Sequence, residues 1–273
     1  FAWWSCVTRR SDFRSMSAGP GRPIDGAARR CPRHRPHGDR PTPTRWSVAR
    51  GVVPVAESSG PADAVLMSER ALVQLATRQH GLVTTQQAAQ LGFDRGSVTS
   101  AVAKGRWRRA GIGVLALGAT PATLHQRTLA AVLSIGEAWA SHSTAARVWG
   151  WEVRHARVEV IVPGGRKVER RNVRVHRSTR LDPEDVAIVG GIPVTSPART
   201  LIDLSGRITV DELATCLDTA LRRRQATIDA VDAMVIATQA TYGRRPRVLS
   251  NLMELRRGAG PTESPLEARI RRV

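Results

Sequence analysis

Basic side chains cluster in the stretch that follows Asp94, and their chemistry suits a polyanion. A guanidinium can donate two parallel hydrogen bonds to a guanine edge, and hydroxyl groups can bind bases or phosphates. The first half of the stretch offers Arg95, Ser97, Thr99 and Ser100. Cations that could neutralise phosphates follow at Lys104, Arg106, Arg108 and Arg109. This pattern predicts an interface for double-stranded DNA.

The run Ser141-His142-Ser143 places two hydroxyl groups beside a base. Nucleophilic catalysis also needs an orienting acid and an oxyanion site, and the sequence assigns neither. We therefore interpret His142 as a loop residue that caps a helix from Ser143 to Trp149. Trp149 and Trp151 are interpreted as core residues rather than as stacking platforms.

The cysteines indicate neither a disulfide framework nor a metal site. Cys6, Cys31 and Cys216 are odd in number and far apart. Cys31 is followed by His34 and His37, but no second Cys/His pair stands at zinc spacing. We expect no metal and no cofactor in this chain.

The overall charge agrees with a nucleic-acid partner without proving one. The chain of 273 residues has 42 Lys and Arg against 23 Asp and Glu, a net charge of +19. A second basic run, Arg166 to Arg180, could be another phosphate-binding surface, an attachment site for an acidic partner, or a solvated hairpin face. No stretch approaches the roughly 20 apolar residues of a membrane span, so we expect a cytoplasmic protein without membrane contact.

The first 66 residues differ from the rest of the chain. They are rich in Arg and Pro and lack helical or strand periodicity, which predicts a disordered leader over 1–66. The chain begins at Phe1, and Met67 opens the first patterned segment. We hypothesise that translation starts at Met67.

The elements that must hold the basic residues follow from capping signals and glycines. Ser68 is expected to cap a first helix that ends before Gly81. Thr84 is expected to cap a second helix, and Asp94 a third. Two short strands with a glycine turn complete the unit after Arg106. The pattern predicts a winged helix-turn-helix domain over residues 67–119.

Residues 120–240 carry a different alternation of elements. A helix over 122–135 precedes β-rich runs at 158–162, 173–176 and 186–194, and helices return at 197–204, 210–223 and 228–238. This order predicts an α+β domain with a small mixed or antiparallel sheet and C-terminal helices. Residues 241–273 are interpreted as a linker and the start of another helix near Pro265.

Four motifs together resemble the actinobacterial form of the AbiEi antitoxin family, from about Met67 to about Arg224. They are the runs 80–84, 106–114, 141–150 and 191–203. The resemblance implies a winged helix that binds operator repeats and represses its own promoter. It also implies a C-terminal domain that counters a cognate, nucleotidyltransferase-like toxin in abortive phage infection. The sequence departs from the family pattern at Leu115, where the wing usually has a tyrosine. Leucine has no hydroxyl group with which this position could contact a phosphate.

The tail is similar to the opening helix of an endonuclease-like domain of the very-short-patch-repair type, over residues 264–269. That resemblance implies a Mg²⁺ site of clustered carboxylates, of which Glu267 could be the first. The chain stops soon afterwards, so as given it is not expected to cut DNA.

The sequence thus favours a DNA-binding transcriptional regulator. A fragment of a DNA endonuclease with its catalytic domain beyond residue 273 is the main alternative. A second alternative is a protein-interaction module that neutralises a toxin without binding DNA. The operator, the toxin and the oligomeric state stay open.

Overall fold

The computed structural model describes residues 61–118, 122–154, 157–164, 167–242 and 246–259. The leader through residue 60 therefore lies outside the described residues, as does the nuclease-like segment with Glu267. Residues 61–66, expected in the leader, are instead part of the first helix. The predicted α+β class is confirmed, with one antiparallel and one mixed sheet.

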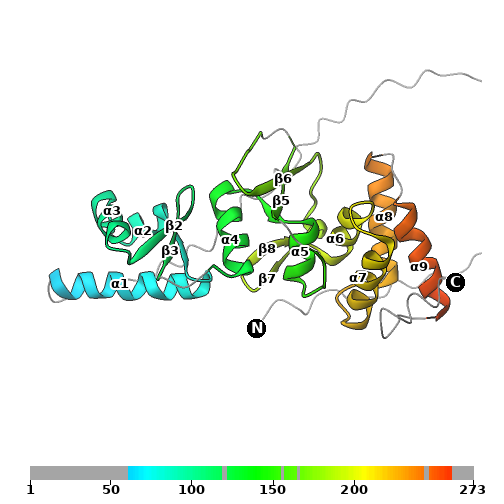
Figure 1. The fold of residues 1–273 in the computed structure, drawn as a ribbon, viewed down its shortest axis with the longest axis horizontal. Coiled ribbons are helices and arrows are strands. Elements are labelled where there is room, and N and C mark those ends of the chain that lie inside the picture. The colour runs from blue at the N-terminus through cyan, green and yellow to red at the C-terminus, as the bar shows by residue number, and fades with distance from the viewer. Residues whose placement is uncertain (1–60, 119–121, 155–156, 165–166, 243–245, 260–273) are drawn as a thin grey trace, which may run out of the picture. The chain divides into compact units, whose positions relative to one another are not determined.

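The first part of the described chain has the element order of a winged helix (Figure 1). Its sheet has the strand order β1-β3-β2, and both pairings are antiparallel. The predicted wing is therefore present, and the sequence missed only the three-residue strand β1. The elements are α1 (Pro61–Arg78), β1 (Leu82–Thr84), α2 (Thr85–Gln90), α3 (Arg95–Ala103), β2 (Trp107–Gly111) and β3 (Val114–Leu117).

Side-chain caps set where the two short helices begin. The Thr84 hydroxyl accepts the Gln87 amide N–H at 3.1 Å, and the Gln87 side chain accepts the Thr84 N–H at 2.8 Å. The Asp94 carboxylate accepts the Ser97 N–H at 2.7 Å. Both predicted caps are confirmed, and each satisfies an amide that has no partner within its helix.

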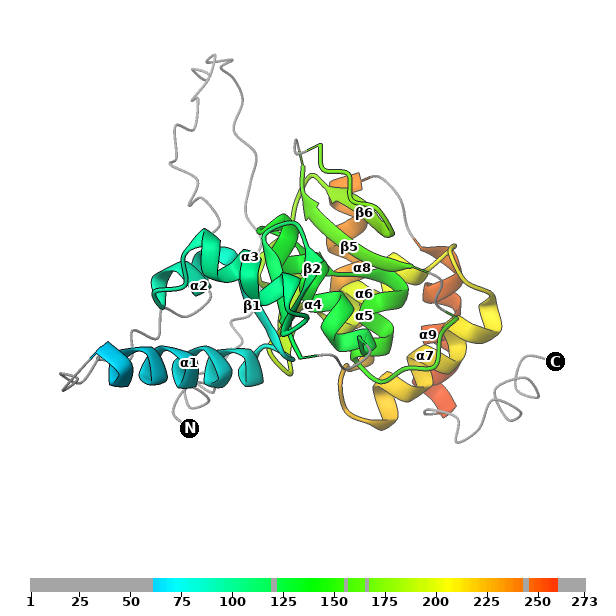
Figure 2. The same ribbon diagram turned by 60° about the vertical axis from the view of Figure 1, so that its left-hand side comes forward.

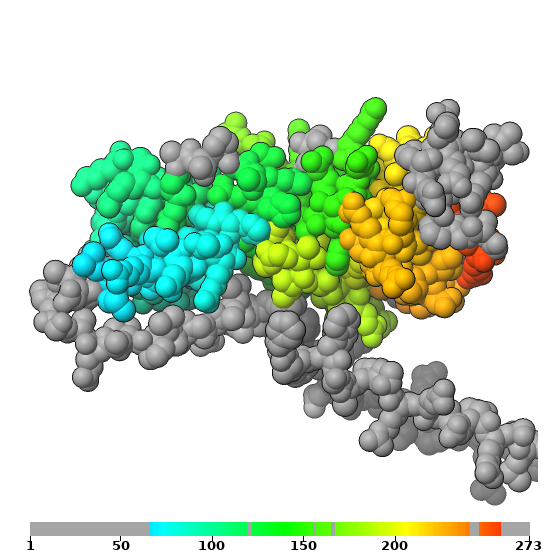
Figure 3. Space-filling model, turned by 90° about the horizontal axis from the view of Figure 1, so that it is seen from below, coloured from blue at the N-terminus to red at the C-terminus, as the bar shows by residue number. Residues whose placement is uncertain are grey.

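Helix α1 begins earlier than its sequence suggested. It starts at Pro61 and runs through Ser68, so Ser68 is a residue of the helix and not its cap. Figure 3 shows α1 at the surface, and its buried side is short, with Leu72 and Ala76 packed in one cluster with Val83 and Leu115. No helix in the described part of the chain combines the length and hydropathy that a membrane span requires.

The second part of the described chain is built around a five-stranded sheet of order β6-β5-β4-β8-β7. The pairs β5/β6 and β4/β8 are parallel and the other two pairs are antiparallel. The elements up to the last strand are α4 (Leu124–Ile135), β4 (Trp139–Ala140), α5 (His142–Val148), β5 (Val158–Pro163), β6 (Val173–Ser178), the 3₁₀ turn η1 (Pro183–Asp185), β7 (Val186–Val189) and β8 (Ile192–Thr195). The helices α6 (Pro197–Leu204), α7 (Val210–Arg222), α8 (Ile228–Tyr242) and α9 (Arg247–Ala259) follow.

Helix α4 is shared by the two sheets (Figures 1 and 2). Its residues Leu129 and Ala130 pack in one cluster with Val114 and Ala116 of the wing sheet and with Val194 of β8. Further along, α4 packs against every second residue of β5. The hydrophobic core therefore continues from the winged helix into the five-stranded sheet.

Residues 247–259, expected in a linker, form helix α9 instead. Leu249, Leu252 and Met253 are at most 2% exposed and belong to the core that α7 and α8 share. The Arg256 guanidinium makes two hydrogen bonds, at 3.0 and 2.9 Å, to the carboxylate of Asp218 in α7. The basic residues before α9 suggested a linker, but tertiary packing of its apolar side stabilises the helix.

Candidate nucleic-acid interface

Helix α3 divides its residues between the core and solvent. Val98 and Ala101 are buried, whereas Arg95, Ser97 and Thr99 are exposed. The outward side at the start of α3 is therefore polar and accessible, as a helix that reads base edges requires. The Thr99 hydroxyl donates to the Arg95 carbonyl at 2.8 Å, so its hydrogen is held by the helix. Ser100 is partly buried.

The cations near α3 have no acidic partner in the described chain. The ion pairs among the described residues involve other side chains, so the following cations are available to an external anion: Arg95, Lys104, Arg106 and Arg109. The nearby acid Asp94 is the cap of α3. Hydrogen bonds from Ser97 lower its pKa, so it is an anion at neutral pH.

Arg108 and Arg109 project from opposite faces of the wing sheet. Arg109 is opposite Leu115, which packs with α1, α2 and α3, whereas Arg108 is opposite Ala116, which packs with α4. Residues paired across two strands share a face. The sequence grouped the two arginines, but Arg108 instead donates to the Gln126 side chain of α4 at 3.3 Å.

The turn of the wing is short and lies against other elements. Gly113 accepts the Thr85 amide N–H at the start of α2, at 2.9 Å. A Cβ added at Gly111 would stand 3.2 Å from the Ser134 Cβ of α4. Ile112, between the two glycines, is 68% exposed. Leu115, where the family usually has tyrosine, is fully buried and cannot contact a phosphate.

The second basic run lies on and beside strand β6. Because β5 and β6 are parallel, the run belongs to a crossover connection and not to a hairpin. Arg174 pairs with Glu159 at 3.7 Å, and Arg180 donates to Asp182 at 2.6 Å. Arg171 and Arg177 are exposed. The choice among a phosphate surface, an acidic partner and a solvated face stays open.

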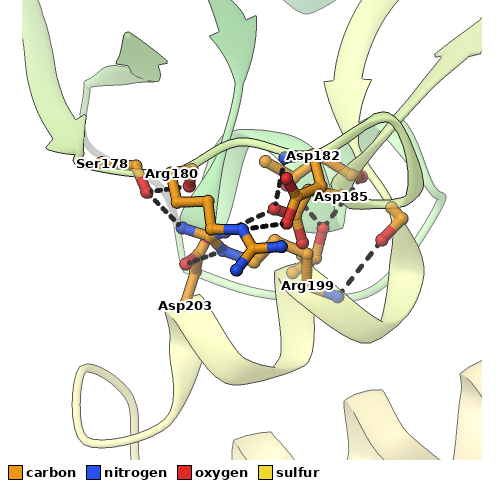
Figure 4. A network of polar contacts seen from close by, with 9 residues as sticks. Ser178, Arg180, Asp182, Asp185, Arg199 and Asp203 are labelled. Atoms are coloured by element: carbon orange, nitrogen blue, oxygen red, sulfur yellow. Dashed lines mark hydrogen bonds and ion pairs between the residues drawn. The ribbon is translucent and has the colours of Figure 1, made fainter. Parts of the chain in front are cut away.

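Arg199 organises a buried network that explains part of the 191–203 motif (Figure 4). Its guanidinium donates to Asp203 at 2.9 Å, to Asp185 at 3.1 Å and to Ser178 at 3.1 Å. Burial raises the pKa of Asp203, and the Arg199 charge opposes that shift. The network joins α6 to η1 and β6, so it holds the fold together.

A second polar cluster consists of His142, Glu159 and His176. The sequence pointed only to His142. His142 is the first residue of α5, not a loop residue, and has φ 50°. Its ring stacks on His176 of β6 with centroids 3.6 Å apart, and His176 lies 3.3 Å from a Glu159 oxygen. Burial lowers the pKa of His142 to about 3, with a further contribution from His176. Trp149 and Trp151 pack against the core, as predicted.

Comparison with protein families gives two matches. Residues 70–118 match a model described as transcriptional regulator, AbiEi antitoxin, and residues 130–255 match the AbiEi antitoxin C-terminal domain. Among solved structures, the RV2827C protein from Mycobacterium tuberculosis aligns at 14% identity and a TM-score of 0.48, over 76% of this chain and 80% of that one. No curated protein matches the chain.

Proposed function

The chain belongs to the AbiEi antitoxin family, and from this premise we propose that it represses its own promoter by binding operator DNA through α3 and β2. The observation that carries the proposal is the group of exposed cations without acidic partners beside the outward side of α3. A duplex would supply the missing negative charge. Docked as winged helices commonly dock, the domain would put the N-terminal half of α3 in the major groove.

Some of these side chains would contact bases and others would contact phosphates. Arg95, in the first turn of α3, is placed to make a bidentate contact to guanine, with Ser97 beside it. Phosphate contacts fall to Lys104, Arg106 and Arg109. Arg108 lies on the other face of the sheet and contributes less to the interface.

Salt dependence follows from the number of phosphate contacts. Three contacts give a slope of about −2.7 in log K against log salt. Raising salt from about 50 to 200 mM then weakens binding by about 40-fold, and by only about 12-fold after one contact is removed.

The decisive experiment compares two adjacent arginines on the promoter of the gene itself. In fluorescence anisotropy, Arg109→Ala should weaken binding and flatten the salt slope by about 0.9, whereas Arg108→Ala should change both less. Arg95→Ala should reduce the preference for the operator over a scrambled duplex. Equal, small effects of all three variants in folded protein would reject this interface. No binding by the wild type would favour a protein-interaction module.

We also propose that residues 130–255 counter a nucleotidyltransferase-like toxin encoded beside this chain. Co-expression tests this separately from DNA binding. The double variant Arg95→Ala/Arg109→Ala should lose repression of a promoter reporter and still rescue growth from the toxin. Failure of the wild type to rescue growth would contradict the antitoxin role of this domain and leave the DNA-binding result intact.

A further inference from the structure

Three side chains that could ligate a metal meet at one end of the five-stranded sheet. His142 begins α5, Glu159 lies on β5 and His176 lies on the edge strand β6. Each offers one ligand atom, and these atoms lie within 4.8 Å of one another. The register puts Glu159 and His176 on the sheet face opposite the valines that pack on α4, because β5 pairs Ile161 with His176.

The donor set suits zinc and chemically similar ions. Two imidazole nitrogens and one carboxylate oxygen bind Zn²⁺ in protein sites that keep a fourth position open. The His176 and Glu159 side chains are 13% and 15% exposed, so an ion has a way in.

We propose that His142, Glu159 and His176 bind one divalent transition-metal ion of the zinc type, which links α5 to β5 and β6. The site is independent of the DNA interface and of the proposed repression. Because a ligated metal lies near the plane of each imidazole, the two rings cannot stay stacked at 18° and both point at the ion. One ring turns when the ion binds, so stacking and ligation are alternative states.

Neighbouring charges determine how tightly such an ion is held. Arg174 lies 3.7 Å from Glu159 and competes with a cation for that carboxylate. Removal of the Arg174 charge should therefore strengthen metal binding, an effect not expected of a structural histidine pair.

The test titrates Zn²⁺ into the full chain after treatment with a chelator, using isothermal calorimetry. A Cys6→Ser/Cys31→Ser background removes thiols that could bind Zn²⁺ elsewhere. One ion per chain is expected. His142→Gln, Glu159→Gln and His176→Gln should each weaken binding by at least about tenfold, and Zn²⁺ should no longer raise their melting temperatures.

Two arginine variants keep the result interpretable if a ligand variant misfolds. Arg174→Gln should tighten Zn²⁺ binding by about fivefold. Arg177 lies on the same strand but projects from the other face of the sheet. Arg177→Gln removes the same charge and should therefore have little effect on Zn²⁺ binding. His125 stacks on His80 with ring centroids 5.6 Å apart, outside the proposed site. His125→Gln should therefore not change Zn²⁺ binding. Absence of Zn²⁺ binding, or binding unchanged by the ligand variants, would overturn the proposal.

Discussion

Replacement of Arg256 by alanine should strongly destabilise the protein. Arg256 and Asp218 are each 3% exposed and joined by two hydrogen bonds, at 3.0 and 2.9 Å. Arg256→Ala removes one charged partner and two hydrogen bonds from the buried Asp218 carboxylate, and removal of one member of such a pair costs about 3–5 kcal/mol. For a protein of this size the melting temperature should fall by roughly 6–20 °C.

The assay is urea denaturation followed by circular dichroism, with the neighbouring arginine as control. Arg257 pairs with Asp232 at 2.7 Å and Glu254 at 3.0 Å, but its side chain is 42% exposed. Arg257→Ala should therefore cost less than about 1 kcal/mol. The double variant Arg256→Met/Asp218→Leu removes both charges and should be more stable than Arg256→Ala.

A loss below about 1 kcal/mol for Arg256→Ala, equal to that of Arg257→Ala, would refute the reasoning. It would mean that α9 is not docked on α7 in solution. The antitoxin domain would then end before α9, and the apolar side of α9 would need another cover.

The remaining predictions concern a glycine contact and the buried thiol. Gly111→Ala brings a methyl group to 3.2 Å from the Ser134 Cβ and should destabilise the wing by roughly 1 kcal/mol in urea melts. Gly96 lies in α3, and a methyl group there meets no atom closer than 3.6 Å, so Gly96→Ala should leave the free energy of unfolding unchanged or raise it. Burial raises the pKa of the Cys216 thiol to about 12, so in a Cys6→Ser/Cys31→Ser variant Ellman's reagent at pH 8 should detect no thiol until urea is added. Above pH 9 the unfolded thiol ionises while the folded one stays protonated, so the free energy of unfolding should fall by up to about 1.4 kcal/mol per pH unit. The Cys216→Ala variant should lack this contribution to the pH dependence of stability.

Signals local to a few residues made the winged helix predictable. Thr84 and Asp94 are caps whose partners lie three residues ahead, and the wing is a basic strand and an apolar strand around a glycine turn. The runs that form β5, β6, β7 and β8 were also predicted, because valines and isoleucines alternate or cluster there. Strands β1 and β4 have three and two residues, too few for a periodic pattern to appear.

Long-range features were beyond the sequence. Whether Arg108 faces α3 or α4 depends on strand register, and neighbouring residues on a strand always face opposite ways. His142, Glu159 and His176 come from three elements far apart in the sequence, without the short spacing that marks a zinc motif. The parallel pairing of β5 with β6 brings Glu159 and His176 together, and the packing of α5 on β5 adds His142; both are tertiary contacts.

The shared helix α4 makes the winged helix dependent on the domain that follows it. One face of the wing sheet packs on α1, α2 and α3, and the other, with Leu82, Val114 and Ala116, packs on Leu129 and Ala130 of α4. Without α4 these fully buried side chains would face water, at a cost of roughly 25 cal/mol for each Å² of apolar surface exposed. Displacement of α4 would therefore also move the sheet that carries Arg109. DNA binding and the C-terminal domain share one core, so a perturbation of either reaches the other through α4.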